Sequence, residues 1–448
     1  MAIRTNLFTG FTRRNMAVTP PKRWRNVSAL PCKQPTTLCA EVTSTMPINA
    51  GDTAWVLVAT GLVFLMLPGV AFLEAGFLRA KNVVSTMMQV FTAAFLVSII
   101  YIIIGFTLSF GPDQGGILGG LSFLGLRDVD GNAWAGTTIP GLLYFAFQLM
   151  FAAVTVALVT GAIAERMRYL SFFIFVAVFV FIYAFPAHWV WGGGWLARLG
   201  VVDFAGSIVV HITAGVASIV AALMLGRRIG FGQPGLEGHN LSLGALGGFL
   251  LWFGWFGFNG GSALAANGVA ATALVNTNMA AASGAFAAIM MTWSRFGKPS
   301  LVMGINGSLA GMAAVTGGAG YVSPISALVI GVVAGLLMVL GMRLVKGKLG
   351  VDDALDVSCI HGIPGIWGAL AVGLFADGRL GNVTGLFAGG GLRQLAVQGV
   401  GSLVVLALVG GLSFAVLFAL KRAGVLRPNT ADELVGLDIA DHREKAYA

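Results

Sequence analysis

The sequence has few charged residues. Only 10% of its 448 residues are Asp, Glu, Lys or Arg, whereas 57% are hydrophobic and the mean hydropathy is +0.87. Soluble globular domains carry about 25% charged residues, so this composition excludes an ordinary soluble enzyme. It indicates a polytopic membrane protein, in which glycine, here 64 residues, lets helices pack closely.

Cysteine is also scarce. Cys32, Cys39 and Cys359 are too few and too scattered for a disulfide framework or a zinc site. The chain has no HExxH-type signature and no basic patch with interleaved aromatic residues. We therefore expect no metal, no cofactor, no catalytic residues and no nucleic-acid partner.

What the sequence does have is long apolar runs. Eleven of them are long enough to cross a lipid bilayer, and together they predict an all-α polytopic membrane protein with eleven transmembrane helices. Their approximate ranges are 53–77, 83–110, 140–163, 169–187, 205–225, 241–260, 268–293, 300–320, 325–345, 358–376 and 394–420.

The loops between these runs differ in charge. If alternate loops lie on alternate sides, one side receives fourteen Lys and Arg residues and the other only Arg127, Arg198, Arg379 and Arg393. The positive-inside rule then predicts a cytoplasmic C-terminus and, with eleven spans, an external N-terminus, in a cell (plasma or inner) membrane.

The N-terminal segment conflicts with that topology. Residues 1–50 carry seven Lys and Arg residues and one acid, Glu41, and they contain no apolar core typical of a signal peptide. They are either a disordered basic extension or an artefact of an upstream start, with Met46 as the true one. We expect the eleven-helix domain over 51–424 and a cytoplasmic tail over 425–448.

Two histidines in apolar runs share one pattern. His211 follows Asp203 by eight residues and precedes Gly215 by four, and His361 has the same spacing from Asp353 and Gly365. Eight helical residues rise ~12 Å and half a hydrocarbon core is ~15 Å, so each histidine would lie near the midplane. The pattern recurs in the fifth and tenth spans, which predicts an inverted five-plus-five repeat with one extra C-terminal helix.

Ionisable groups at the midplane are usually functional, although a histidine can also be a simple polar bridge between helices. Neutral imidazoles donate and accept hydrogen bonds, which suits a small polar molecule in an apolar channel. A bis-histidine haem site is the alternative from another class of protein. For Asp203 and Asp353, and for Asp352 and Asp356, helix capping is the expected role, and Asp203 could also attract a cation. Glu74 is expected to pair with Arg79 or Lys81.

Aromatic residues cluster near the ends of several runs. Most of them are expected to be interface or core residues. Trp191, in HWVWGGGW, lies beside glycines and could offer its ring face to a cation, with Ser262 as a hydrogen-bond acceptor.

The sequence resembles the Amt/Mep/Rh ammonium transporter family, specifically its Amt branch. The similarity runs from about residue 51 to the tail, and several long, ordered motifs carry it: RAKNVVSTMMQ, GAIAERMR, DFAGSIVVHITAG, WFGFNGGSA and VDDALDVSCIHGIPGIWG. The resemblance implies transport of ammonium, with methylammonium as a possible second substrate.

The resemblance also implies roles for individual residues. Trp191, Phe151 and Ser262 would recruit ammonium outside, Phe151 and Phe258 would close the pore, and His211 and His361 would line its lumen. Asp203 would match an aspartate needed for activity. The family implies a homotrimer and a PII signalling protein as a possible cytoplasmic partner. Whether ammonia crosses alone or the proton is transported with it stays open.

Two segments depart from the family pattern. Glu74 lies where many relatives have a tyrosine-glycine-glycine stretch, and Arg443 in the tail replaces the usual glycine. The other alternative is that the protein senses ammonium. The tail disfavours this, because it has only about 24 residues and carries no fused output domain.

Overall fold

The computed structural model describes residues 46–447, in which helices joined by loops make up most of the chain and one short hairpin pairs β1 (Asp113–Gln114) with β2 (Leu118–Gly119). Residues 1–45, which make up most of the expected basic extension, lie outside the described residues. The boundary between the eleven-helix domain and the tail stays a prediction.

Eleven apolar helices in the described part of the chain are long enough to cross a membrane, as predicted. They are α1 (Ala50–Phe77), η1–α2–η2–α3 (Ala80–Phe110), α4 (Gly141–Ile163), α5–α6 (Tyr169–Leu199), η4–α7 (Ser207–Leu225), α8 (Leu241–Gly261), α9 (Gly268–Phe296), α10–η5 (Leu301–Gly318), α11–η6 (Pro324–Lys348), η7–α12 (Ser358–Phe375) and α13 (Arg393–Arg422). The short helices η3 (Leu121–Leu126), η8 (Leu386–Ala388), α14 (Thr430–Val435) and η9 (Asp438–His442) lie between or after them.

Polar side chains mark where several of these helices begin. Asn49 accepts hydrogen bonds from the first amides of α1, Asn267 from those of α9, and Ser323 from that of Ser326 in α11. Such caps satisfy amides that have no partner within the helix. The caps therefore place the helix starts within a few residues of the predicted ones.

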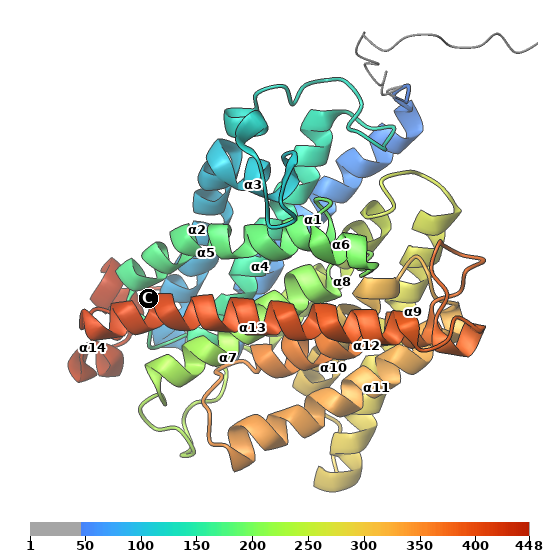
Figure 1. Cartoon of the computed structure of the whole chain (residues 1–448). Helices are drawn as coiled ribbons and strands as arrows, with labels where there is room; N and C mark the ends of the chain where they lie inside the picture. Colours follow the sequence, from blue (N-terminus) through green and yellow to red (C-terminus); the bar gives the residue numbers. More distant parts are fainter. Residues whose placement is uncertain (1–45, 448) are drawn as a thin grey trace, which may run out of the picture. The chain divides into compact units, whose positions relative to one another are not determined.

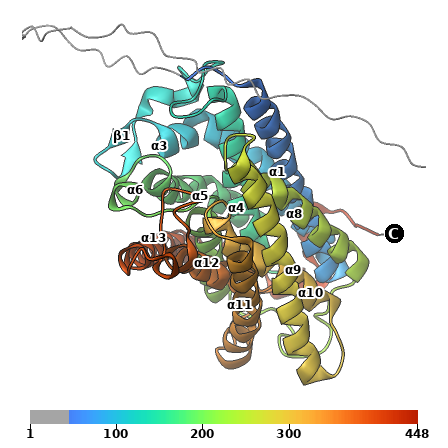
Figure 2. The same cartoon turned by 90° about the vertical axis from the view of Figure 1, so that its right-hand side faces the viewer.

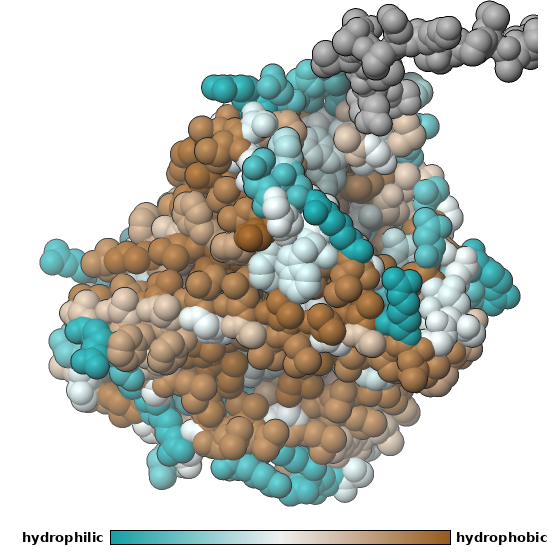
Figure 3. Space-filling model, viewed as in Figure 1, coloured by the Kyte–Doolittle hydropathy of each residue, from teal (hydrophilic) through white to brown (hydrophobic). Residues whose placement is uncertain are grey.

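Glycines let the helices approach closely. Helices α1 and α8 lie side by side (Figure 2), and a Cβ atom added to Gly247 would lie 2.1 Å from the backbone nitrogen of Leu73. Close backbone packing of this kind is how membrane helices associate without a hydrophobic driving force. Helix α13 crosses the outside of the bundle (Figure 1), and apolar side chains cover the face that it crosses (Figure 3).

The fifth and tenth spans cross through glycines as well. A Cβ atom on Gly215 would lie 2.2 Å from the Cα of Gly362, and one on Gly365 would lie 3.1 Å from the Cβ of His211. Each span starts with a π-helical turn, η4 (Ser207–Ile212) or η7 (Ser358–Gly362), and each turn holds one histidine. The two spans thus repeat one local structure, as the shared sequence pattern predicts.

We call the end of the bundle that carries the tail the inner end and the opposite end the outer end. Buried ion pairs join the loops at the inner end: the Arg228 guanidinium lies 3.0 Å from Glu165 and 2.9 Å from Asp352. Burial alone would raise the pKa of both carboxyl groups, but the facing guanidinium groups hold both pKa values below their ordinary range. Asp352 is thus an ion-pair residue, and the expectation that it caps a helix is wrong.

The tail packs against the inner end. Asp438 accepts a hydrogen bond from the Ser85 amide at 2.8 Å, and Asp441 accepts one from the Tyr169 amide at 3.0 Å. Arg443 has a φ of 57°, in the left-handed region that favours glycine. A residue other than glycine at this φ adds backbone strain, but the tail still docks.

Candidate functional site

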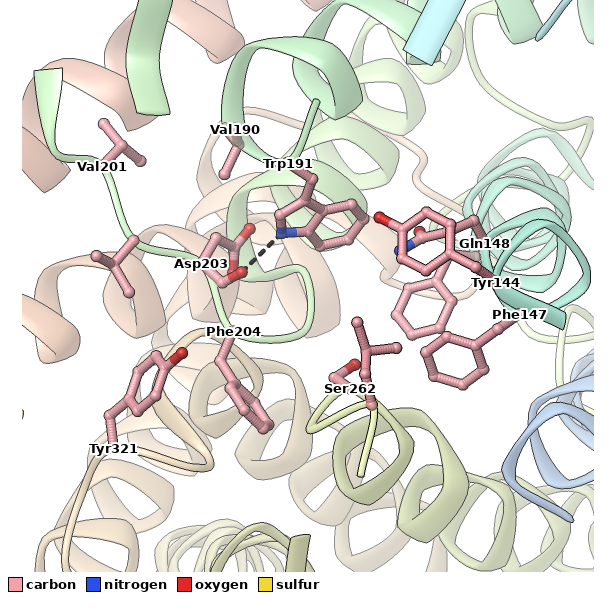
Figure 4. Close-up of a pocket in the computed structure, with 13 residues that line it drawn as sticks. Tyr144, Phe147, Gln148, Val190, Trp191, Val201, Asp203, Phe204, Ser262 and Tyr321 are labelled. Atoms are coloured by element: carbon pink, nitrogen blue, oxygen red, sulfur yellow. Dashed lines mark hydrogen bonds between the residues drawn. The ribbon is translucent and has the colours of Figure 1, made fainter. Parts of the chain in front are cut away.

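A cavity of ≈330 Å³ opens at the outer end and brings together residues from five separate segments. Phe151 of α4, Trp191 after α5, Asp203 before η4 and Ser262 after α8 are among the residues that line it. Figure 4 shows Trp191 on one side of the space and Ser262 on the other. The cavity walls are aromatic rings with a few polar atoms, which suits a small cation.

Hydrogen bonds fix the two facing side chains. The Trp191 indole donates from Nε1 to the Asp203 carbonyl oxygen at 2.7 Å, which sets the direction of the ring face (Figure 4). The Ser262 hydroxyl donates to the Phe258 carbonyl at 2.8 Å. Since the Ser262 proton is used in this bond, its oxygen presents lone pairs to the cavity and acts as an acceptor there.

Two phenylalanine rings close the floor of the cavity. The rings of Phe151 and Phe258 stack with centroids 4.1 Å apart and an interplanar angle of 25°. Both side chains are about 1% exposed or less. Phe258 in turn stacks on the His211 ring at 5.9 Å, so an unbroken column of rings runs from the cavity to the histidines.

The two histidines are in direct contact. The Nδ1 atoms of His211 and His361 lie 3.3 Å apart and the ring centroids 5.2 Å apart. In an Nδ1 to Nδ1 hydrogen bond one nitrogen donates and the other accepts, so at least one imidazole lacks a proton at this atom. The two axial imidazoles of a haem lie on opposite faces of the porphyrin, and rings that contact each other directly leave no space for a porphyrin between them, so the geometry does not fit the haem alternative.

The outer nitrogen of the pair has no protein partner. Among the described residues, nothing hydrogen-bonds to the buried Nε2 of His211. The Trp255 ring covers the pair, with its centroid 5.3 Å from that of His211 and 6.4 Å from that of His361. A buried polar atom without a partner inside an apolar column is a place where a small molecule could bind.

Both expected capping aspartates hold the turns that carry the histidines. The Asp203 carboxylate accepts four backbone N–H bonds, from residues 206 to 209, at 2.8–3.0 Å. Asp353 accepts from the amides of Val357 and Ser358 and from the Ser358 hydroxyl. A carboxylate at a helix start is favoured by the amide dipoles, so capping accounts for both residues.

A smaller cavity of ≈140 Å³ lies at the inner end, and Phe77, Asn306, Leu355 and Asp356 are among the residues that line it. Asp356 is paired with Lys346 through Oδ2 at 2.7 Å, while its buried Oδ1 has no partner among the described residues. Burial raises the pKa of this carboxyl to about 6. Asp356 is therefore an ion-pair residue of the inner cavity, and it does not cap the following helix.

The expected pairing of Glu74 with Arg79 or Lys81 is wrong. Glu74 is 3% exposed and accepts a hydrogen bond from the Thr160 hydroxyl of α4 at 2.7 Å. The helix α1 ends at Phe77, and the extended backbone of Leu78 directs Arg79 away to Glu165 at 2.9 Å. Glu74 thus stays inside the bundle without a basic partner among residues 46–447.

Sequence reasoning missed several residues of the column and the cavity. Trp255 was expected to be core or interface, but it covers both histidines and donates to the Thr316 hydroxyl at 3.0 Å. Gln148 and Tyr144 line the outer cavity as well. The spacing was a usable signal, because Trp255 and Gln148 lie three residues before Phe258 and Phe151 and so share their helix faces.

Comparison with known proteins decides the family. The model of the Ammonium Transporter Family matches residues 54–447. The chain belongs to the ammonium transporter family. Members of this family are transporters and not enzymes, so the protein is a multi-pass membrane transporter.

The matches to individual members of the family cover most of this chain and most of each relative. The chain is 43% identical to the ammonium transporter Amt1 of Archaeoglobus fulgidus over 89% of this chain and 100% of the relative, and 41% identical to the ammonium transporter of Bacillus subtilis over 89% and 99%. A solved structure titled Sensor Amt Protein is 33% identical with a TM-score of 0.81, covering 88% of this chain and 98% of that one. Mep2 of Candida albicans is 32% identical with a TM-score of 0.80, over 86% and 87%.

Proposed function

We propose that the protein transports ammonium by capturing the cation in the outer cavity and conducting ammonia past the histidine pair. The observation that carries the proposal is the continuous column from the outer cavity through Phe151 and Phe258 to His211 and His361. Each step of the proposed path has a physical reason in this column.

Capture uses the face of the Trp191 ring and the lone pairs of Ser262. A cation over a tryptophan ring gains about 0.5–2 kcal/mol, and the serine oxygen accepts one of its N–H bonds. The stacked phenylalanines then form an apolar barrier, which costs a charged species several kcal/mol and a neutral one far less. Ammonium can leave its proton behind and pass as ammonia, whereas potassium keeps its charge.

The histidines offer ammonia the hydrogen bonds that the apolar walls withhold. Because one Nδ1 donates to the other, the donating imidazole has a lone pair at its Nε2 and the accepting imidazole carries its proton at Nε2, so the pair offers one acceptor and one donor along one track, with the Nε2 of His211 free of protein partners among the described residues. The proposal therefore assigns His211 and His361 to the lumen, Phe151 and Phe258 to the gate, and Trp191, Phe151 and Ser262 to recruitment.

Uptake of labelled methylammonium by cells without their own ammonium carriers tests the proposal. We expect the wild-type chain to restore uptake and the double variant His211→Ala/His361→Ala to abolish it. His239→Ala is the matched control, because His239 lies at the inner end, where it bonds to Leu78 and Tyr447. Normal uptake by the double variant would refute the lumen role.

We propose further that the protein is a homotrimer in the plasma or inner membrane, with one pore per subunit, and that a PII signalling protein can block its cytoplasmic face. Family membership supports the trimer, and the single column of rings within residues 46–447 supports one pore per chain. Native mass spectrometry would show trimers, and a monomer would refute this part.

The expected orientation and the PII partner have separate tests. A fluorescent protein fused to the C-terminus reports a cytoplasmic tail, because it fluoresces only there, and a dark, fully expressed fusion would reverse the topology. A purified PII protein added at the tail side of proteoliposomes should lower methylammonium uptake, and unchanged uptake would remove it as a partner.

A further inference from the structure

One buried carboxyl group has no part in the path described so far. Glu74 lies in the inner third of α1, is 3% exposed and has one side-chain partner, the Thr160 hydroxyl. A buried acid without a counter-charge is costly, and a glutamine or a leucine would serve a purely structural contact at less cost. The presence of an acid here therefore suggests that its ability to bind and release a proton is used.

Glu74 lies between the histidine pair and the inner cavity. A Cβ atom on Gly161 would meet Glu74 Oε1 at 2.9 Å and Val357 Cγ2 at 2.8 Å, so these two groups flank the same point. Val357 precedes His361 by four residues, or about one helical turn of ~6 Å. On the other side, Glu74 precedes Phe77, which lines the inner cavity, by three residues or ~4.5 Å.

The elements that surround Glu74 offer no competing ionisable group at its depth. The sequences of α2 and α8 contain none, and α4 contains only Tyr144, which lines the outer cavity. The segment before η7, whose Leu355 amide bonds to the Gly161 carbonyl, contributes two acids: Asp356, paired with Lys346 at the inner cavity, and the buried Asp353, whose two oxygens are taken by the amides of the following turn. Glu74 is therefore the candidate acid on the inner side of the histidine pair, and Asp356 is the alternative proton acceptor.

We propose that Glu74 receives the proton of the histidine pair and passes it to the cytoplasmic side, so that net transport moves one positive charge. The proposal rests on the proposed transport function and adds the proton's exit route. The Glu74 O–H bond first breaks to give its proton to water in the inner cavity. An imidazole of the pair takes the proton that ammonium gives up as it becomes ammonia, so an ammonium N–H bond breaks as an imidazole N–H bond forms. The carboxylate then takes this proton from the imidazole through water, and a new O–H bond forms as the imidazole N–H bond breaks. The transfer leaves both groups neutral, as apolar surroundings favour.

The charge moved per transported substrate tests this route. Full-length protein in proteoliposomes receives a methylammonium pulse, and the current and the uptake of labelled methylammonium are measured under the same conditions. Wild type should move about one charge per molecule. Glu74→Gln, which keeps the size and the Thr160 contact but cannot exchange a proton, should lower this ratio several-fold while uptake persists.

Three variants make the result specific. Thr160→Val removes the hydroxyl but keeps the carboxyl, so the ratio should stay at the wild-type value. Asp356→Asn tests the alternative exit, and a fall in the ratio there but not in Glu74→Gln would overturn the proposal. If Glu74→Gln does not fold, Glu74→Ala takes its place. Because current and uptake both scale with the amount of active protein, the charge moved per transported molecule does not depend on that amount.

The outcomes separate this inference from the transport function. Absence of uptake by wild type would refute the transport function itself. Uptake by wild type without current, or an unchanged ratio in both Glu74 variants, would overturn the proton route and leave ammonia transport standing. A lowered ratio confined to the Glu74 variants would support the route.

Discussion

Replacing the Asp203 carboxylate tests how the structure positions the outer histidine. Oδ1 accepts two backbone N–H bonds, from Gly206 at 3.0 Å and Ser207 at 2.8 Å, and Oδ2 accepts two from Ile208 and Val209 at 2.8 and 3.0 Å. In Asp203→Asn, one oxygen remains and the new amide group faces two N–H donors. Two charge-assisted bonds are lost at about 1.5–3 kcal/mol each, so the expected cost is about 3–6 kcal/mol.

The matched variant is Asp353→Asn in the tenth span. Its two oxygens each accept one backbone bond, and the Ser358 hydroxyl can turn to accept from the new amide. Only one backbone bond is lost, so we expect a cost of about 1.5–3 kcal/mol. The structure thus predicts a rank order, with Asp203→Asn the less stable of the two.

Thermal unfolding of purified protein in detergent measures this order, with methylammonium uptake in proteoliposomes as the second measurement. Asp203→Asn should lower Tm by several degrees and reduce uptake, because η4 and its His211 lose their anchor. An unchanged Tm, or a larger loss in Asp353→Asn, would refute the capping argument. Loss of uptake at a wild-type Tm would instead show that the charge of Asp203 acts on the cation directly.

Three further predictions follow from other contacts. Phe258→Ala should open the apolar barrier, so that potassium current relative to ammonium current rises above the wild-type value, and an unchanged ratio would exclude Phe258 as the gate. Since burial raises the pKa of Asp356 to about 6 from an ordinary 3.8, the folded protein holds a proton there between about pH 4 and 6 that the unfolded chain has released. The free energy of unfolding should therefore fall by about 3 kcal/mol as pH rises through that window. Tm of Asp356→Asn should rise relative to wild type between pH 4 and 7, and parallel Tm curves would contradict this. Arg228→Met leaves Glu165 buried without that partner and should cost about 3–5 kcal/mol by thermal unfolding, whereas Arg379→Gln, in an exposed pair, should cost at most about 1 kcal/mol. Equal losses in these two variants would show that burial of the Arg228 pair adds nothing.

The membrane spans and the two capped turns that hold His211 and His361 could be predicted because they depend on local sequence. Each span is a run of apolar residues whose length matches the bilayer, so its position follows from residue transfer energies without knowledge of the fold. The spacing of Asp203 to His211 repeats at Asp353 to His361, and both aspartates do cap the turns that hold the histidines. These are contacts within one element.

Contacts between elements were harder to predict. Glu74 lies five residues before Arg79, and the short separation suggested an ion pair. The structure ends α1 at Phe77 and sends Arg79 to Glu165, which leaves Glu74 facing Thr160 of another helix. The pairing was decided by the direction of the chain after the helix, and hydropathy does not encode that direction.

The sequence by itself determined that this chain has eleven helices apolar and long enough to cross a membrane and that two histidines occupy matched positions in the fifth and tenth of them, because both follow from apolar length and residue spacing. Only the tertiary structure decided that the rings of Phe151 and Phe258 form a column ending at the touching histidines, that Trp255 covers them and that Glu74 is buried below them. The physical reason is that close helix packing through glycines brings together side chains far apart in the chain, and hydropathy and spacing do not encode which of these side chains meet.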